Sequence, residues 1–370
     1  MNGIEPVFPA DLSCFSPDYR RARNAFIDAA ERAGATVTTY SHPLAGPQGE
    51  ALATDTAWLG PDDAQSVLVL ISATHGVEGF CGSAVQIDFL SRSKMLPAGL
   101  AVLLVHAINP HGFAWLRRVT EDGVDLNRNY VNYSHMLPIN EGYDELAMAI
   151  VPASLDSRSL QQSDECLAVY LATHGQEAYE KALSAGQYGH PHGLFYGGLA
   201  PTWSRITSEK IISGFGLAKR KRVALIDLHT GIGPFAYGEP ICDHPPGSTG
   251  VRLARLWYGD SVTEPALGNS ISVAKHGLSD YGWMQRIGEP LVFIALEFGT
   301  CSFDNMMHVL RADHWLHAQG IVDWSDPDTR TIKEAIRNHF YPATPDWQAK
   351  VIGRSRQCIE QALSGLAAEV

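Results

Sequence analysis

Four short apolar runs constrain the fold of this chain more than any other feature. Val, Ile and Leu occupy most positions in each run, and Gly, Pro or Asn residues stand near the ends. Continuous apolar character, in place of alternation, is typical of strands in a sheet that is covered on both faces. We therefore expect four buried strands, at Ser66–Ala73, Leu100–Ile108, Arg222–Leu228 and Leu291–Glu297.

Helical patterns fill much of the remaining sequence. The clearest begins at Asp18, has apolar residues at three-to-four spacing and closes before Gly34, a residue type that is common just after a helix. The expected helices are Asp18–Ala33, Ser83–Leu90, Leu160–Leu183, Asp304–His317, Thr329–Phe340 and Trp347–Ala368.

The alternation of strands and helices indicates the fold class. It favours an α/β fold with a mixed, largely parallel central sheet and helices on both faces. No clean linker divides the chain, so we expect residues 1–370 to form one domain with loop decorations. Gln187–Pro201 is too irregular for a helix or a strand and is expected to form a long surface loop.

Composition argues against nucleic-acid binding. The chain carries 28 Lys and Arg residues against 40 Asp and Glu residues, which gives a formal net charge of −12. Nucleic-acid binding relies on clustered positive charge, and this balance is acidic. The one basic cluster, Lys219–Arg222, precedes an apolar run and is interpreted as a helix C-terminus, where cations complement the helix dipole.

The chain is also expected to be cytoplasmic and without a membrane partner. No stretch approaches the roughly 18 apolar residues that span a bilayer. Met1–Asp11 lacks the basic-then-apolar pattern of a signal peptide. Scattered cysteines without a CxxC pair indicate free thiols in a reducing compartment. These cysteines are Cys14, Cys81, Cys166, Cys242, Cys301 and Cys358.

Two polar motifs at strand ends predict a metal site, because ligands bind at that edge of open α/β sheets. Thr74-His75-Gly76-Val77-Glu78-Gly79 follows the first strand, and its imidazole and carboxylate can point at one cation. Asp227-Leu228-His229-Thr230-Gly231 closes the third strand and supplies a second imidazole. Each motif alone more often makes ordinary hydrogen bonds, but two His and one Glu form an established catalytic zinc set. We therefore predict that His75, Glu78 and His229 hold one Zn²⁺ per chain.

Further motifs place charged side chains near the predicted metal. Arg117-Arg118 and Asp125-Leu126-Asn127-Arg128-Asn129 follow the second strand, and guanidinium groups suit two-pronged carboxylate binding. A solvated charged loop is the alternative interpretation. Glu297 closes the fourth strand, where a buried carboxylate without a partner is costly. Near zinc it can move a proton from water to a leaving amine; the alternative is a structural carboxylate that caps the next helix.

Taken in order, these motifs resemble those of a known family. This ordered set is similar to that of zinc metallocarboxypeptidases of the carboxypeptidase A type. It consists of HxxE, Asn109-Pro110-His111-Gly112, the arginines, the 125–129 motif, the downstream His and the late Glu. Asp-Leu-His-Thr at 227–230 and Glu-Phe-Gly-Thr at 297–300 also resemble the aspartoacylase and succinylglutamate desuccinylase group. As a whole, the chain is most similar to a mostly bacterial branch of this superfamily. The resemblance implies a carboxypeptidase-like, phosphorylase/hydrolase-like architecture.

The resemblance also implies roles at the metal. His75, Glu78 and His229 match the family's zinc ligands. Asp125 matches the outer carboxylate that orients His75, and such outer partners set ring geometry and ligand basicity. Glu297 matches the general base and acid, which receives a proton from water and returns it to the leaving amine.

Substrate contacts follow from the same resemblance. Asn127 and Arg128 match the residues that bind the substrate's terminal carboxylate. One of Arg117 and Arg118 would polarise the scissile carbonyl, and Arg118 is favoured. Family carboxypeptidases also use a mobile tyrosine before the catalytic glutamate, for which Tyr281 is the candidate here.

The simplest function is a zinc metallocarboxypeptidase that hydrolyses an amide next to a free carboxylate and releases C-terminal amino acids. The first alternative is an N-acyl amino-acid deacylase with the same site, and the second is a binding module without catalysis. The expected partner is therefore a peptide or an N-acyl amino acid, and a homo-oligomer remains open. A serine hydrolase is disfavoured because the chain has no GxSxG motif.

Overall fold

The computed structural model of this chain describes residues 12–92 and 96–368. The Met1–Asp11 segment, where no signal pattern is expected, lies outside the described residues. The strands are β1 (Thr36–Ala45), β2 (Ala51–Leu59), β3 (Ser66–Ile71), β4 (Leu100–His106), β5 (Arg222–Phe235), β6 (Gly238–Ile241) and β7 (Leu291–Gly299). Within the described residues they form one seven-stranded sheet in the order β1-β2-β4-β3-β5-β7-β6.

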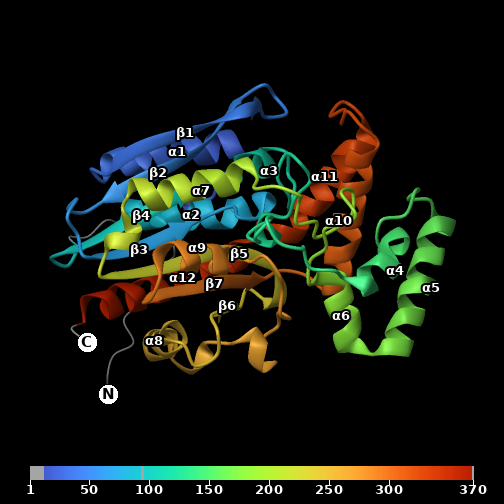
Figure 1. The fold of residues 1–370 in the computed structure, drawn as a ribbon. Coiled ribbons are helices and arrows are strands. Elements are labelled where there is room, and N and C mark those ends of the chain that lie inside the picture. Colours follow the sequence, from blue (N-terminus) through green and yellow to red (C-terminus); the bar gives the residue numbers. More distant parts are fainter. Residues whose placement is uncertain (1–11, 93–95, 369–370) are drawn as a thin grey trace, which may run out of the picture.

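The helices surround this sheet and extend beyond one end of it (Figure 1). They are α1 (Tyr19–Arg32), α2 (Gly79–Ser91), α3 (Pro110–Ala114), α4 (Glu141–Ile150), α5 (Ser157–His174), α6 (Gln176–Ser184), α7 (Trp203–Gly214), α8 (Thr249–Tyr258), α9 (Ser279–Ile287), α10 (Phe303–Ala318), α11 (Pro327–Phe340) and α12 (Pro345–Ala367). None of the described helices is both long enough and apolar enough to cross a membrane.

The four strands expected from the sequence form the parallel centre of the sheet. β3 pairs in parallel with β4 on one side and with β5 on the other, and β5 pairs in parallel with β7. β1, β2 and β6 extend the two edges in antiparallel pairs. The expected mixed, largely parallel sheet is therefore confirmed. The sequence analysis missed the edge strands because β1 is mostly exposed and β2 carries Ala, Thr and Asp in place of Val and Ile.

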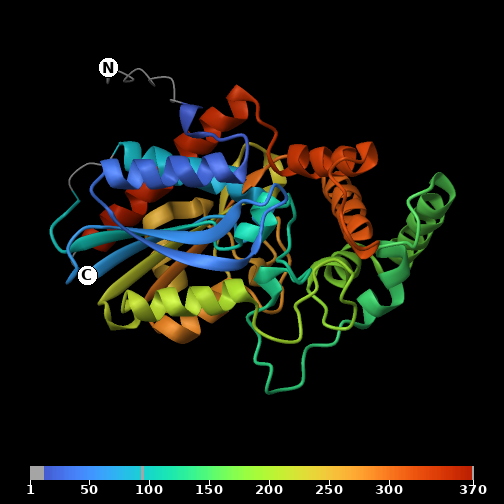
Figure 2. The same cartoon turned by 90° about the horizontal axis from the view of Figure 1, so that it is seen from above.

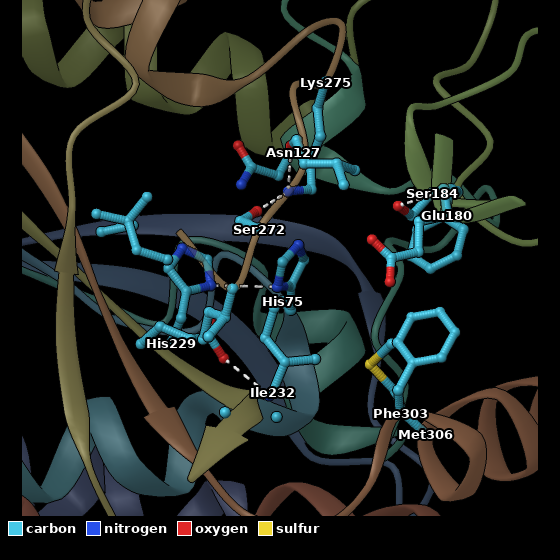
Figure 3. Close-up of a pocket in the computed structure, with 18 of the residues that line it drawn as sticks. His75, Asn127, Glu180, Ser184, His229, Ile232, Ser272, Lys275, Phe303 and Met306 are labelled. Carbon is cyan, nitrogen blue, oxygen red and sulfur yellow. Dashed lines mark hydrogen bonds between the residues drawn. The ribbon is translucent and has the colours of Figure 1, made fainter. Parts of the chain in front are cut away.

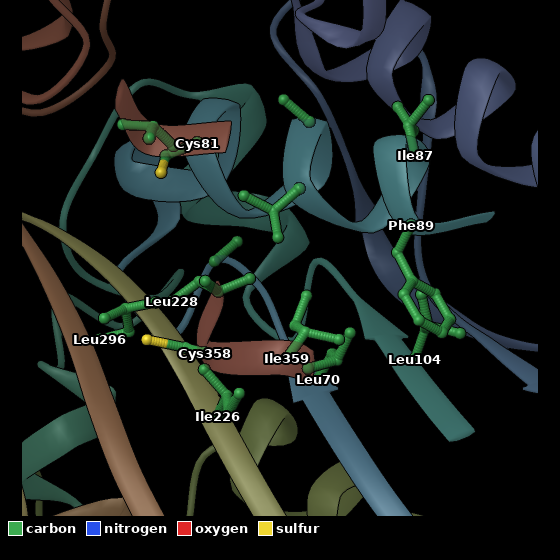
Figure 4. Packing of buried hydrophobic residues seen from close by; sticks show 14 of the residues in the cluster. Leu70, Cys81, Ile87, Phe89, Leu104, Ile226, Leu228, Leu296, Cys358 and Ile359 are labelled. Atoms are coloured by element: carbon green, nitrogen blue, oxygen red, sulfur yellow. The ribbon is translucent and has the colours of Figure 1, made fainter. Parts of the chain in front are cut away.

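Helices cover both faces of the sheet, as Figure 2 shows from above. On one face, α1, α2, α8 and α12 share a core cluster with Leu70 of β3 and Leu228 of β5. Part of this cluster is drawn in Figure 4, where Cys358 of α12 lies beside Leu228. Cys358 and Cys81 of α2 are both buried free thiols. On the other face, α7 and α9 pack with a second cluster that includes Val69 of β3. Successive side chains of β3 point to opposite faces, which explains its unbroken apolar run.

Most expected helices are present with small changes at their ends. Asp18 caps α1 by accepting a hydrogen bond from the backbone N–H of Arg21. The expected single helix at Leu160–Leu183 is wrong, because Gly175 divides it into α5 and α6. Gly175 has φ +82°, a conformation that a helix interior does not contain and that glycine adopts without steric cost.

The basic cluster at 219–222 begins at a helix C-terminus as expected, but that helix is only the single turn Leu217–Lys219, with Arg220 at its C-cap. α7 ends earlier, at Gly214, and Arg222 already belongs to β5. The arginines nevertheless bind carbonyl groups at helix ends, which lack intrahelical partners. Arg220 donates to the carbonyl oxygen of Phe215 after α7, and Arg222 donates to that of Ala368 after α12.

The 187–201 segment has no helix or strand, as expected, but it is only partly a surface loop, because residues 187–188 and 193–198 are buried. Tyr188 and Phe195 are 8% and 3% exposed. The buried side chain of Gln187 supplies partners that water would otherwise provide. Its amide group donates to the carbonyl of Leu194 and accepts from the backbone N–H of His190. Internal hydrogen bonds of this kind allow an irregular segment to be buried.

Candidate metal centre

The candidate site lies at the carboxyl ends of β3 and β5, two adjacent parallel strands. In the sheet, β4, which follows β3 in the chain, lies beside β3 on one side, and β6 and β7, which follow β5, lie beyond β5 on the other side. Ligands of open α/β sheets bind at such a point, where the direction of the strand order reverses. His75 follows β3, and Glu78 ends the one-turn helix Gly76–Glu78. His229 lies inside β5 and not at its end as expected, because β5 and β7 remain paired through Gly231 and Gly299.

The structure brings the three predicted metal ligands together. Ligand atoms of His75, Glu78 and His229 all lie within 4.8 Å of one another, and all three residues are buried. Nδ1 of His75 is 2.9 Å from one carboxylate oxygen of Glu78, and Nδ1 of His229 is 2.9 Å from the other. The two Nδ1 atoms lie 3.2 Å apart.

A carboxylate stands behind each imidazole. Oδ1 of Asp125 lies 3.3 Å from Nε2 of His75, as the resemblance implied. Oδ2 of Asp227 lies 3.0 Å from Nε2 of His229, a partner that the sequence analysis missed. The spacing of Asp227 and His229 could have indicated this contact, since residues two apart on a strand share a face. Asp227 is itself held by the hydroxyl of Thr74, which donates to Oδ1 at 2.8 Å.

This donor set fits a divalent metal such as zinc. With a metal bound, a proton on each Nε2 would face a carboxylate and leave the Nδ1 lone pair free to bind the metal. Nitrogen ligands about 2.0–2.1 Å from a tetrahedral zinc ion stand about 3.3 Å apart, close to the observed separation of the two Nδ1 atoms. Nη2 of Arg118 also lies 2.7 Å from Nε2 of His75, and this contact must lengthen when Nε2 carries the proton.

A cavity of about 340 Å³ opens over the two histidines (Figure 3). Its walls come from β5 and β7, from the one-turn helix Leu126–Arg128, from α6 and α10, and from the segment at 271–278. It is therefore built from parts of the chain that lie far apart in sequence. Its size falls within the range typical of small-molecule sites, towards the lower end.

The two adjacent arginines point in different directions. Arg118 lines the cavity, and its guanidinium donates to Oδ2 of Asp125 at 3.0 Å and to Glu78 at 3.3 Å. Burial alone would raise the pKa of Asp125, but Arg118 and His75 outweigh burial and hold this pKa well below its usual value. Arg117 instead donates to Asp313 at 2.9 Å and is absent from the cavity wall.

Asn127 and Arg128 also line the cavity, but much of their hydrogen-bonding capacity is used within the protein. Oδ1 of Asn127 accepts from the backbone N–H of Ser279 at 2.7 Å. Arg128 is 1% exposed and donates only to backbone carbonyls among its described partners. The ring of Phe195 lies 5.4 Å from the guanidinium carbons of both Arg118 and Arg128. Phe195 therefore helps to position both arginines through cation–π contacts.

Glu297 lies opposite His229 in the β5–β7 pair and lines the cavity. Its Oε1 accepts from the backbone N–H of Ile232 at 3.3 Å. Burial and the neighbouring Glu78 carboxylate raise the pKa of Glu297 to about 7. A carboxyl group with its pKa near neutrality can both accept and donate protons, as an acid–base residue must.

Several residues line the cavity that were not predicted from the sequence, and one predicted site residue does not line it. Tyr281 lies on α9 and is not among the residues that line the cavity. The cavity wall instead includes Lys275 and Asp243, with Glu180 of α6 and Phe303 of α10. These residues carry no motif, because loops and flanking helices bring them to the site only in the folded chain.

Comparisons with known proteins agree with this architecture. The fold is similar to that of carboxypeptidase A from Helicoverpa armigera, with a TM-score of 0.51 and 14% identity over 95% of this chain and 74% of that chain. Thrombin activatable fibrinolysis inhibitor is more distant, with a TM-score of 0.48 and 11% identity over 95% of this chain and 75% of that chain. Succinylglutamate desuccinylase from Chromobacterium violaceum has a TM-score of 0.36 and 15% identity, over 89% of this chain and 75% of that chain.

Sequence comparison gives the family. A search of curated proteins found no match. The sequence model of one family, described as "Protein of unknown function (DUF2817)", matches residues 15–354. The carboxypeptidase-like fold inferred from the ordered motifs is confirmed by the structural likeness. This chain belongs to the DUF2817 family and has an α/β fold similar to that of carboxypeptidase A.

Proposed function

We propose that this protein is a zinc-dependent hydrolase that cleaves an amide bond next to a free carboxylate, most simply a metallocarboxypeptidase. The observation that carries the proposal is the convergence of His75, Glu78 and His229 at the base of a cavity that also holds Arg118 and Glu297. A module that only bound its ligand would have no need of a buried acid–base carboxylate beside a metal site. We further propose that one catalytic domain spans residues 1–370.

The proposed reaction assigns a task to each residue of the site. Zinc, when bound, supplies Lewis-acid activation of water and of the substrate carbonyl. Glu297 takes the proton of the attacking water and delivers it to the amine as the carbon–nitrogen bond breaks. Arg118, beside the metal ligands, stabilises the negative charge that develops on the carbonyl oxygen. Asp125 and Asp227 keep His75 and His229 in the metal-binding orientation.

The proposal that the substrate carries a free carboxylate rests on the positive charge in the cavity wall. Asn127 and Arg128 meet there, as the family resemblance implies for the residues that hold the substrate's terminal carboxylate. A buried guanidinium without a carboxylate partner favours an anionic ligand. We assign no role to Tyr281, since it lies outside the cavity wall.

An N-acyl amino-acid deacylase is the second candidate function. The observation that favours it is the limited cavity, about 340 Å³, closed on one side by Glu180 of α6 and by Phe303 and Met306 of α10. These side chains leave room for a short acyl group or one or two residues, and less room for an extended peptide. Both candidates use the same chemistry and differ in the group on the acyl side of the scissile bond.

Metal analysis and a matched substrate panel test the proposal together. Protein purified without chelators should contain one zinc per chain, and His75→Ala and His229→Ala should lose it while the exposed His308→Ala retains it. Steady-state rates are then compared for short peptides, N-acetyl amino acids and N-succinyl amino acids. Faster turnover of peptides supports the carboxypeptidase, and exclusive turnover of the acyl amino acids supports the deacylase. Metal-loaded protein that cleaves no amide in the panel would refute the hydrolase assignment.

A further inference from the structure

The cavity lining contains a further cation besides Arg118 and Arg128, Lys275, which no sequence motif indicated. Lys275 lies in the irregular segment between α8 and α9, and it lines the cavity together with Asn127 and Ser272. Figure 3 shows its side chain extending from this segment toward the two histidines, with its ammonium end beside Ser272. The ammonium donates hydrogen bonds to the hydroxyl of Ser272 and to the carbonyl oxygen of Val273.

Arg128, the expected carboxylate contact, is poorly placed to bind a ligand directly. Its Nε and Nη2 both donate to the carbonyl oxygen of Ser184, at 3.2 and 2.8 Å, and Nη1 donates to that of Asn127 at 2.7 Å. Phe195 lies over the guanidinium, which is 1% exposed as a residue. A guanidinium fixed in this way contributes positive charge to the wall while presenting few free N–H groups.

Lys275, by contrast, retains donor capacity and has more exposure to the cavity. An ammonium group has three N–H donors, and the two described partners of Lys275 are neutral oxygens. Burial and the positive charge of Arg128 lower the pKa of Lys275 to about 8, which leaves it mainly charged at neutral pH. A partly buried ammonium held only by neutral groups is costly unless an anion approaches it.

Neither Arg128 nor Lys275 has a carboxylate at ion-pair distance. The two cations share the cavity lining with the carboxylates of Asp243, Glu297, Glu180 and Asp304. Within residues 12–92 and 96–368, neither cation has a carboxylate oxygen within 4.0 Å, and Asp243 influences both only at longer range, as Glu297 does for Lys275. Arg118, in contrast, is paired with Asp125. A carboxylate on the ligand can therefore form the ion pair that Lys275 lacks.

We propose that Lys275 makes the direct ionic contact with the free carboxylate of the substrate, while Arg128 acts as a fixed positive charge behind it. The inference rests on the proposed function for the reaction itself but assigns the recognition step to a different residue.

Equilibrium binding of products tests this assignment independently of catalysis. The probes are free amino acids and the corresponding amino-acid carboxamides, which differ only in the charge at the carboxyl end. Binding to metal-loaded protein is measured by calorimetry for the wild type, Lys275→Met, Lys275→Arg and a control, Lys181→Met. Lys181 is an exposed lysine of α6 that does not line the cavity.

The wild type should bind the carboxylates more tightly than the carboxamides. Loss of a hydrogen bond to a charged group should reduce this preference by about 10- to 100-fold in Lys275→Met. Lys275→Arg should keep most of the preference, and Lys181→Met should keep all of it. In kinetics, Lys275→Met should raise KM for carboxylate substrates far more than it lowers kcat.

Two results would overturn the assignment: full carboxylate preference in folded Lys275→Met, or equal binding of carboxylates and carboxamides by the wild type. Failure of the proposed function looks different. Wild-type protein that cleaves no amide but binds carboxylates through Lys275 would refute the hydrolase and retain the assignment. Cleavage that is indifferent to Lys275 would retain the hydrolase and refute the assignment.

Discussion

Asp227 and His229 lie two residues apart on β5, and Oδ2 of Asp227 is 3.0 Å from Nε2 of His229. The pair repeats on one strand the arrangement that Asp125 and His75 make across two loops. Each imidazole thus has a carboxylate on one nitrogen and faces Glu78 with the other. Both histidine ligands of the candidate metal site are therefore oriented by a carboxylate.

Asp227→Asn should weaken metal binding without removing a ligand. The amide keeps the shape of the side chain but loses the negative charge that holds the proton on Nε2 of His229. Loss of such an outer partner typically lowers metal affinity by about 10- to 100-fold. Competition with a chromophoric chelator measures the change, with the exposed Asp63→Asn as control. Unchanged affinity in a folded Asp227→Asn protein would show that the contact does not orient the ligand.

Glu297→Gln should abolish most activity while the metal remains bound. Glutamine can still accept the hydrogen bond from Ile232 but cannot carry a proton between water and amine. General acid–base groups typically contribute about 10²- to 10⁴-fold to rate, so kcat should fall by this factor. Zinc content and kcat are measured on the same sample, beside the exposed Glu334→Gln. A variant with full zinc and full kcat would exclude Glu297 as the base.

Gly76→Ala should disturb the turn that carries two of the metal ligands. A Cβ atom at Gly76 would stand 2.1 Å from the carbonyl carbon of Gly112 and 2.3 Å from its Cα. These are backbone atoms, so the HxxE turn must shift. Overpacking of this kind costs about 1–3 kcal/mol in the free energy of unfolding. Urea denaturation should show that loss, and metal affinity should fall with it.

Gly353→Ala is the matched control for that substitution. Gly353 lies in α12, and a Cβ atom there has no neighbour within 4 Å. Alanine favours a helix interior over glycine by about 1 kcal/mol, so this variant should be as stable as the wild type or more stable. Equal effects of the two substitutions would contradict the close packing assigned to Gly76.

Asp313→Asn should strongly destabilise the fold. Asp313 of α10 is buried and accepts from Nζ of Lys333 at 2.5 Å and from Nε of Arg117 at 2.9 Å. Without its charge, two buried cations lose their counter-ion, which typically costs about 3–5 kcal/mol. The exposed pair of Lys350 and Asp346 provides the comparison, since Asp346→Asn should cost about 0–1 kcal/mol. Equal losses in urea denaturation would show that the buried network contributes little.

The same variant should change the response to acid. Burial would raise the pKa of Asp313, but Lys333 and Arg117 outweigh burial and hold it far below its usual value. A carboxyl group with a lowered pKa in the folded state stabilises the fold above its unfolded pKa, about 3.9. That stabilisation is lost as the pH falls below about 4. The difference in unfolding free energy between wild type and Asp313→Asn should therefore narrow in acid, and a constant difference would contradict the lowered pKa.

Local patterns indicated the centre of the fold correctly, and the three residues predicted as metal ligands lie together in the structure. The buried strands could be recognised because a strand covered on both faces must be apolar at nearly every position. Edge strand β1 could not, since it is mostly exposed and its place depends on pairing with β2. The predicted ligands meet because parallel strands bring their carboxyl ends to one edge of the sheet.

The direction in which each side chain points could not be predicted from the sequence. Arg117 and Arg118 are adjacent and chemically identical, yet one contacts Asp313 and the other lines the cavity. The buried position of the 187–201 segment depends on hydrogen bonds that only the folded chain supplies.

The sequence by itself determined which residue types stand at the ends of the central strands, and hence the kind of metal chemistry that these residues can support. Only the tertiary structure decided which side chains line the cavity. Lys275, Asp243 and Phe195 reach the site from segments without regular periodicity. Periodic patterns report burial of a strand or helix, whereas the direction of a side chain in a loop is set by partners distant in sequence.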